Sequence, residues 1–292
     1  MISKLRRHLS YWPVYFRSFV ARNNQFYSRC SHLSRHKKAL ILGNGPSLQD
    51  FVASADWASI GSSHDVYCVN NFAFQDAFIL CKPSEYVIFD PNYFNALEAD
   101  LASGNSLFIK LAETVDWDMN LYIPIRFYSM SQALIELFRG TSIRLVFFRD
   151  VGLKLYFRFP FLYLMKHQIL MPRANNVLIA AIYLSILNGH SKVVIDGADH
   201  SWHKNLHVSD DNLLYIKDSH FYDKEPDLSP LYKDRLSGQH FSMEEIFESY
   251  RLVHKSYRVI GELSASLGVK IFNQTPGSFI DAFPRMGRSD SV

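Results

Sequence analysis

The sequence predicts an α/β protein with a Rossmann-like, mostly parallel sheet flanked by helices, a lid segment and a basic N-terminal helical arm. Three observations predict this fold class. Short apolar runs of strand length alternate with runs of helical length, which is typical of parallel sheets. The first such run, residues 39–42, ends in a glycine turn, Gly43-Asn44-Gly45-Pro46-Ser47. Polar residues also follow several predicted strands, where open α/β sheets bind ligands.

The predicted strands are short apolar runs, and all but that at 106–109 are followed directly by Gly, Asn or Asp. They cover residues 39–42, 65–69, 85–89, 106–109, 192–195 and 269–272. The predicted helices cover residues 48–60, 176–187 and 242–267. The second of these helices is apolar and stops at Asn188-Gly189. The third repeats apolar side chains at helical spacing, as in Ile246, Tyr250 and Val253.

Two stretches do not follow this alternation. Residues 143–170 mix Phe, Leu and Tyr with Lys and Arg; either the cations reach solvent from a buried segment, or the stretch contacts a membrane or a lipid-linked substrate. Residues 201–238 are polar and aperiodic, which is typical of a lid or a disordered loop. We therefore expect an arm at 1–36, an α/β domain at 37–285 with a lid at about 201–240, and a loose tail at 286–292.

The composition fits one large domain, because 48% of the 292 residues are hydrophobic. The three cysteines have no metal-ligand spacing, so a reducing compartment is favoured over a disulfide framework. The net charge is +3, yet residues 1–49 hold nine Lys and Arg and no acidic residue. This basic segment predicts an anionic surface as partner; no nucleic-acid partner is expected, and a homo-oligomer is left open.

The basic arm also has one apolar helical face, formed by Leu5, Leu9, Trp12 and Phe16, although Pro13 interrupts it. Such a segment suits a helix that lies in a membrane interface. It equally suits a helix packed on the body with a solvated basic face, and a cleaved presequence is a third interpretation. No apolar run is long enough to span a bilayer. We expect a cytoplasmic protein, peripheral on the inner face of the cytoplasmic membrane.

Four polar residues directly follow predicted strands: Asn44, Asn70, Asn71 and Asp90. Amide side chains both donate and accept hydrogen bonds, so they suit the hydroxyls and base edge of a nucleotide. Asn and Asp also stabilise turns, which is the alternative for each of them alone. Their common position beside a glycine turn favours a ligand site. There, Ser47 is expected to cap a following helix whose N–H groups face an anion.

The run Asp196-Gly197-Ala198-Asp199-His200 follows another predicted strand. Its two carboxylates and imidazole suggest a metal site, but turn and supporting roles are favoured, and no metal site is predicted. His200, His203 and His207 share helical spacing, yet the polar residues between them do not favour zinc. The sequence contains no Gly-x-Ser-x-Gly elbow, no Walker loop and no Gly-x-Gly-x-x-Gly fingerprint.

The glycine turn resembles the start of bacterial family 42 sialyltransferases, where it holds the nucleotide of a CMP-linked sugar. Residues 68–72 and Phe89-Asp90-Pro91 resemble two further donor-binding segments of that family, and 180–199 resembles its helix, glycine, strand and Gly-Ile-Asp. The resemblance covers about 38–95 and 173–285, and only the first motif is specific. MAF-type flagellin glycosyltransferase domains are similar at the same turn, and a pterin diphosphokinase family resembles them in fold.

The chain also departs from the sialyltransferase pattern. Asp90 stands where that family has Asn, and Ser201 and Trp202 stand at the first of its paired phosphate-binding tyrosines. Tyr215 or Tyr222 would substitute from the lid. The family's catalytic His is matched best by His240, with His220 as the second choice.

The resemblance implies an inverting glycosyltransferase that moves an acidic sugar, such as a sialic-acid-like nonulosonate or Kdo, from CMP to a surface glycan or lipopolysaccharide-type acceptor. His240 or His220 would act as base, and no cofactor or metal would be required. The implied donor-binding residues are Gly43, Asn44, Gly45, Pro46, Ser47, Asn70, Asn71, Asp90, Arg173, Asn176, Gly197, Asp199 and Tyr222. Two alternatives are a pterin or nucleotide diphosphokinase with Mg²⁺ at Asp90, Asp196 or Asp199, and a non-catalytic glycan-binding protein.

Overall fold

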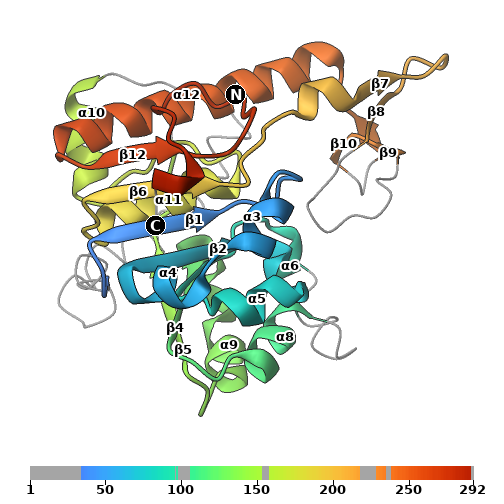
Figure 1. Ribbon diagram of the computed structural model, residues 1–292. Coiled ribbons are helices and arrows are strands. Elements are labelled where there is room, and N and C mark those ends of the chain that lie inside the picture. Colours follow the sequence, from blue (N-terminus) through green and yellow to red (C-terminus); the bar gives the residue numbers. More distant parts are fainter. Residues whose placement is uncertain are drawn as a thin grey trace.

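A computed structural model describes residues 34–95, 97, 106–152, 158–217, 228–234 and 238–290. Its centre is a sheet of seven strands, all parallel, in the order β12-β6-β1-β2-β3-β4-β5 (Figure 1). The strands are β1 (Lys38–Leu42), β2 (His64–Val69), β3 (Glu85–Val87), β4 (Met119–Pro124), β5 (Ile143–Phe148), β6 (Lys192–Asp196) and β12 (Lys270–Asn273). The predicted Rossmann-like α/β fold is confirmed.

The order of the strands creates one reversal in the sheet. The chain adds β2, β3, β4 and β5 in turn on one side of β1, and then returns to place β6 on the other side. β1 pairs in register with both neighbours, so Ile41 lies between Tyr67 of β2 and Ile195 of β6. In open α/β sheets such a reversal leaves a crevice at the carboxyl ends of the strands.

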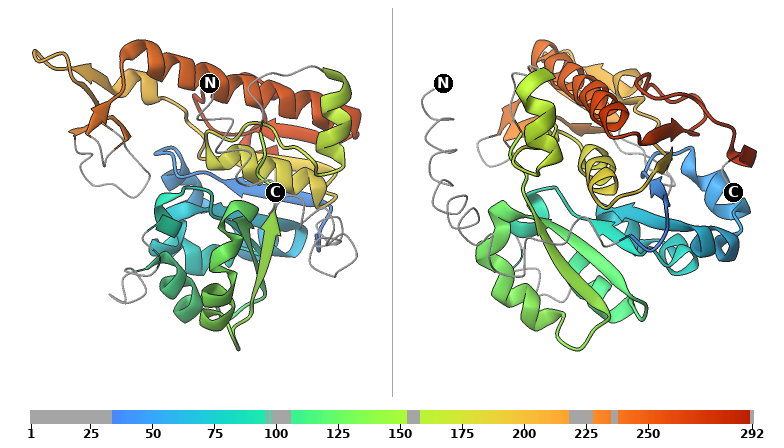
Figure 2. Two further views of the ribbon diagram at one scale, coloured as in Figure 1. Left: turned by 180° about the vertical axis from the view of Figure 1, so that it is seen from behind. Right: turned by 90° about the vertical axis from the view of Figure 1, so that its left-hand side faces the viewer.

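Helices cover both faces of the sheet (Figure 2). One face carries α3 (Leu48–Ser54), α4 (Trp57–Ser63), α5 (Asp76–Cys81), α8 (Leu107–Thr114) and α9 (Ser131–Leu137). The other carries α10 (Arg158–Lys166), α11 (Val177–Leu187) and α12 (Met243–Ser266). Alternate side chains of each strand enter the two cores: Leu40 joins the first cluster, and Ile41 joins the second.

Helix α11 is buried along its length, from Leu178 to Ile186. It contacts β1, β2, β3 and β6 on one side and α12 on the other, which explains why its sequence is apolar all round. Gly189 follows its C-terminus with φ of 91°, as the predicted stop requires. The predicted helices at 176–187 and 242–267 are therefore confirmed. Ser242 and Glu245 form a capping box at the start of α12.

The predicted strand at residues 106–109 is wrong. Ser106 accepts a hydrogen bond from the N–H of Phe108 and caps helix α8. The apolar positions Leu107, Phe108 and Leu111 follow helical spacing once the window is extended, and all three are buried. The predicted helix at 48–60 is divided into α3 and α4, because Asp56 caps a new helix there.

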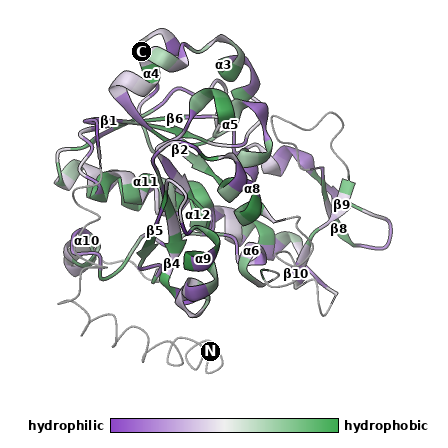
Figure 3. Ribbon diagram, turned by 90° about the horizontal axis from the view of Figure 1, so that it is seen from below, coloured by the Kyte–Doolittle hydropathy of each residue, from purple (hydrophilic) through white to green (hydrophobic). Residues whose placement is uncertain are grey.

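Strands β4 and β5 were not predicted. β5 opens the aromatic stretch at 143–170, and its Phe147 and Phe148 are buried. In Figure 3 both strands are coloured mainly as hydrophobic. Helix α10 follows and buries Met165 in the core under α12. Phe147 and Phe148 of this stretch therefore serve the core.

The described part of the lid segment contains short strands. One small antiparallel sheet joins β7 (Leu206–Val208), β8 (Leu214–Lys217) and β9 (Leu228–Pro230), and a hairpin joins β10 (Tyr232–Asp234) and β11 (Gln239–His240). Figures 1 and 2 show these strands projecting on the side where the strands of the main sheet end.

The tail expected to be loose is attached to the body over its described part. Arg288, in the short helix η6 (Arg288–Asp290), forms an ion pair with the buried Asp196. Most of the basic arm, residues 1–33, lies outside the described residues, so its helix stays a prediction. Within the described part of the chain, no helix is long and apolar enough to cross a membrane.

Candidate functional site

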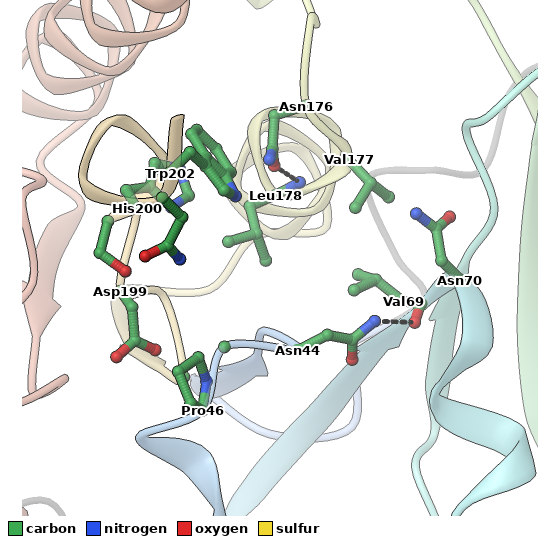
Figure 4. A pocket seen from close by; sticks show the side chains of 14 residues that line it. Asn44, Pro46, Val69, Asn70, Asn176, Val177, Leu178, Asp199, His200 and Trp202 are labelled. Carbon is green, nitrogen blue, oxygen red and sulfur yellow. Dashed lines mark hydrogen bonds between the residues drawn. The ribbon is translucent and has the colours of Figure 1, made fainter. Parts of the chain in front are cut away.

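A pocket of about 140 Å³ lies at the reversal of the sheet, between the ends of β1, β2 and β6 and the start of α11 (Figure 4). Seven of the predicted donor-binding residues line it: Asn44, Gly45, Pro46, Asn70, Asn176, Gly197 and Asp199. The predicted turn, the end of β2, the helix start and the end of β6 thus meet at one place. The fold brings together residues that are more than 150 positions apart in the chain.

The glycines of the turn are required by a close approach between two backbones. The N–H of Gly43 donates to the carbonyl of Asp196 at 2.8 Å, and that of Gly45 donates to Gly197 at 2.8 Å. A Cβ added to Gly43 would lie 2.3 Å from the Gly197 oxygen, and one added to Gly45 would lie 2.0 Å from an Asp199 carboxylate oxygen. Gly197 has φ of +67°. The resemblance implies that the glycines bind the donor; the structure shows that they let the two walls of the pocket meet.

Two amide side chains offer unused acceptors in this pocket. Asn44 donates through Nδ2 to the carbonyl of Val69 at 3.4 Å, while its Oδ1 is buried and has no partner among the described residues. The Oδ1 of Asn70 is buried in the same way, and Asn70 adopts φ of 48°. Buried amide oxygens are normally satisfied. The pair therefore suits a ligand that presents N–H or O–H donors.

The start of α11 forms another wall of the pocket. Asn176 caps the helix by accepting from the N–H of Leu178 at 2.8 Å, and Val177 and Leu178 also line the pocket. The first turn of a helix has N–H groups without intrahelical partners and carries a partial positive charge. This wall suits a phosphate or another anion.

Asp199 is the acidic side chain of the pocket lining. Its Oδ2 accepts from the hydroxyl of Ser47 at 2.8 Å and from the N–H of Ser47 at 3.4 Å. Burial raises the pKa of Asp199 above its usual value, and the Ser47 hydrogen bonds oppose that shift. The predicted cap by Ser47 is wrong: its side chain makes no capping bond to α3 and instead holds Asp199.

His200 and Trp202 line the pocket as well, although the sequence analysis did not place them in the site. The Nε2 of His200 lies 2.6 Å from the hydroxyl of Tyr257, and its ring lies 4.2 Å from the Trp202 ring between centroids. Burial lowers the pKa of His200 to about 3, with His254 adding to the shift. His200 is therefore neutral near neutral pH and is a weak base. Its position directly after Asp199 was the signal available in the sequence.

The other acidic residue of the 196–200 run, Asp196, is used inside the protein. Its Oδ1 accepts from the N–H of Gly197 and from Arg288, and its Oδ2 accepts from Gln274 and Arg288, all at 2.7–2.9 Å. These four bonds occupy both oxygens, so Asp196 is not available as a metal ligand. This removes one of the three carboxylates that could hold Mg²⁺ in the diphosphokinase alternative.

Five predicted donor-binding residues that the structure describes do not line the pocket: Gly43 and Ser47, which lie in the turn behind it, and Asn71, Asp90 and Arg173. The Oδ1 of Asn71 accepts from the hydroxyl of Tyr93 at 2.8 Å, and Asp90 accepts from the N–H of Asn92 at 2.9 Å. The Asp90 contact stabilises a turn after β3, in agreement with the turn alternative, whereas the Asn71 contact joins the segment after β2 to helix α6 (Asn92–Asn95). Arg173 donates to Asn175 at 3.0 Å; burial lowers its pKa, and the charge of Glu248 opposes that.

The predicted base is not part of the pocket lining. His240 lies in β11 of the lid hairpin, with its ring 4.5 Å from that of Tyr232 between centroids. Its Nδ1 is buried and has no partner among the described residues. His220 and Tyr222 lie outside the described residues, so their predicted roles stay untested.

The described residues of the lining combine two free amide oxygens, a helix N-terminus, one carboxylate and an aromatic wall, and they include no Lys or Arg. Such a lining offers hydrogen-bond partners for hydroxyl or amino groups and, at the helix N-terminus, for one anionic group. No protein-family model and no curated protein matches this chain.

Proposed function

We propose that this protein is a glycosyltransferase that moves an acidic sugar from its CMP donor to a surface glycan or lipopolysaccharide-type acceptor. The observation that carries the proposal is the pocket at the β1–β6 reversal, because it joins the glycine turn to Asn44, Asn70, the start of α11 and Asp199. Reversals of this kind are where α/β folds bind nucleotides.

The charge of the pocket favours a ligand with one phosphate. The N–H groups at the start of α11 suit a single phosphate. A diphosphate or triphosphate would bring more charge than this wall neutralises, and the described lining holds no Lys or Arg. The amide oxygens of Asn44 and Asn70 suit donors on the base or ribose, and the Asp199 carboxylate suits ribose hydroxyls.

In the proposed reaction, a hydroxyl of the acceptor attacks the anomeric carbon of the sugar while the bond to the CMP phosphate breaks on the opposite side. His240 takes the proton of the attacking hydroxyl after the lid hairpin moves toward the pocket. The departing phosphate is stabilised by the N–H groups of α11. No metal is needed, because CMP leaves with one phosphate.

The first experiment is a thermal-shift panel with CMP, CDP, UDP, GDP and ATP, each with and without Mg²⁺. A ligand that binds only the native state raises its melting temperature. We expect CMP to stabilise the protein without metal, and the Asn44→Ala variant to lose most of that stabilisation. Stabilisation by ATP with Mg²⁺ alone would instead identify a diphosphokinase and overturn the proposal.

The proposed base is tested by CMP release from CMP-sialic acid and CMP-Kdo in the presence of lipopolysaccharide-type acceptors. We expect His240→Ala to lower kcat by at least about a hundredfold while CMP still stabilises the variant. His207→Ala is the matched control, because His207 is an exposed lid residue on β7. Full turnover in His240→Ala would remove this assignment, and His220→Ala would then be the next variant.

We also propose that the basic arm holds the enzyme at an anionic membrane surface, close to a lipid-linked acceptor. Deletion of residues 1–36 should abolish sedimentation with anionic liposomes and leave CMP binding intact. Binding that persists after the deletion would transfer the proposed membrane contact to residues 143–170.

A further inference from the structure

We propose that Arg288 is a positioning residue that sets the geometry of the nucleotide pocket from outside it. The inference rests on the proposed function for the identity of the ligand, and on the contacts of Arg288 for the mechanism. Arg288 is not among the residues that line the pocket, and it lies in the segment that the sequence predicted to be a loose tail.

Arg288 contacts both walls of the pocket at once. Its Nε and Nη2 donate to the two oxygens of Asp196 at 2.8 and 2.7 Å, at the end of β6. The same Nη2 donates to the carbonyl of Ser47 at 2.7 Å, in the glycine turn after β1. The guanidinium also lies over the ring of Phe51 in α3, 5.3 Å from its centroid. A planar guanidinium holds such a carboxylate with two parallel bonds, which fixes orientation as well as distance.

The two residues that Arg288 holds, Ser47 and Asp196, are each connected to residues that line the pocket. Ser47, held through its carbonyl, donates its hydroxyl to Asp199, which lines the pocket. Asp196 continues into Gly197, whose carbonyl receives the N–H of Gly45. Arg288 therefore determines how closely the glycine turn and the 196–199 turn approach each other. Without it, the fully buried Asp196 would lose its ionic partner, and the walls would keep only the backbone hydrogen bonds and the contact of Ser47 with Asp199.

The test compares Arg288→Ala and Arg288→Lys with the wild type by hydrogen exchange and by calorimetric titration with CMP. Arg258→Ala is the matched control, because Arg258 also pairs with an aspartate, Asp281, but both side chains are more than 60% exposed. In Arg288→Ala we expect exchange in residues 43–48 to rise at least about tenfold, with β2 unchanged, and CMP affinity to fall about tenfold. Arg288→Lys should be intermediate, because it keeps the charge and loses the paired geometry. The control should match the wild type.

Hydrogen exchange reports how firmly Arg288 holds residues 43–48, and it needs no ligand. The proposed function and the proposed role of Arg288 are therefore tested independently. If the wild-type protein does not bind CMP, the proposed function is contradicted, and the exchange data still decide the role of Arg288. Unchanged exchange in residues 43–48 of Arg288→Ala would overturn the inference, because Arg288 would then not hold the glycine turn. An equal rise of exchange in β2 and α11 would also overturn it, because the substitution would then destabilise the whole protein. If Arg288→Ala does not fold, the same comparison is made with Arg288→Lys.

Discussion

At the scale of the residue, the glycine turn shows how one motif has two explanations. Gly43 and Gly45 stand where a ligand would approach, but the atoms nearest to an added Cβ belong to Gly197 and Asp199. The requirement for glycine is therefore internal, and the proposed ligand contacts are those of the neighbouring Asn44 and of Asn70. The motif therefore located the candidate site correctly, but it did not assign the correct role to each of its residues.

The turn makes a direct prediction. Gly45→Ala should destabilise the protein by about 1–3 kcal/mol, because the new methyl group meets Asp199 and the Gly197 carbonyl. Gly61→Ala is the control: Gly61 lies in helix α4, and nothing lies within 4 Å of its added Cβ. That change should stabilise by about 0.5–1 kcal/mol. Urea unfolding measures both, and equal stability of the two variants would contradict the packing argument.

At the scale of the element, a row of buried polar side chains crosses the sheet on the α11 face. Glu85 of β3 accepts from the Tyr122 hydroxyl at 2.7 Å and from the Asn120 amide at 3.0 and 3.1 Å. Asn188, at the end of α11, donates to the hydroxyls of Tyr122 and Tyr67. These bonds join three strands and one helix, each at a fixed position along its length. We infer that they help set the strand register, since a slipped strand would leave them unpaired.

Glu85 makes the stability of this row depend on pH. Burial raises the pKa of Glu85 to about 8, whereas it is about 4.3 in an unfolded chain. Between these values the native state keeps a proton that the unfolded state has lost. Its contribution to stability is therefore complete below about pH 4.3, falls as the pH rises, and levels off above about 8.

The variant Glu85→Gln should lose this slope, because glutamine imitates the protonated side chain and does not titrate. The free energy of unfolding, measured by urea titration from pH 5 to 8, should decline less with pH in the variant than in the wild type. Glu136→Gln is the control, since Glu136 is an exposed partner of Arg139. The same decline in Glu85→Gln and wild type would show that Glu85 is already ionised in the native state.

At the scale of the whole molecule, two buried histidines lie at opposite ends of the strands, one at the amino ends and one beyond the carboxyl ends. Burial, with the charges of Lys38 and Lys192, lowers the pKa of His64 at the start of β2 to about 4. Burial also lowers the pKa of His200, beyond the end of β6, to about 3. Both are neutral in the native state and titrate near pH 6.5 when unfolded. Unfolding therefore takes up protons below about pH 6.5, and this part of the stability is lost as the pH falls toward 4.

The double variant His64→Gln, His200→Gln should show a shallower loss of stability between pH 6.5 and 4.5 than the wild type. Urea midpoints across this range measure the slope, which reports the proton uptake on unfolding. His207→Gln should keep the wild-type slope, because His207 is exposed. If the double variant loses stability with acid as steeply as the wild type, other groups account for the acid dependence.

Several elements were predictable because their signal is local. Strands β1, β2, β3, β6 and β12 are short apolar runs that end in turn residues, and α11 and α12 repeat apolar side chains at helical spacing. Residues 106–109 were misassigned because a four-residue apolar run fits strand and helix alike. β5 was missed because Arg144, which is exposed at this edge strand, interrupts the apolar run.

The sequence by itself determined the fold class, the glycine turn and the set of polar residues that follow strands, since these depend on neighbours along the chain. The tertiary structure decided which of them form a site. The reversal at β1 and β6 brings Asn44, Asn70 and Asp199 to one pocket and leaves Asp90 two strands away. The tertiary structure also joins Arg288 to Asp196, which lie 92 residues apart in the chain. Such pairings follow from the order of strands in space, which no local pattern encodes.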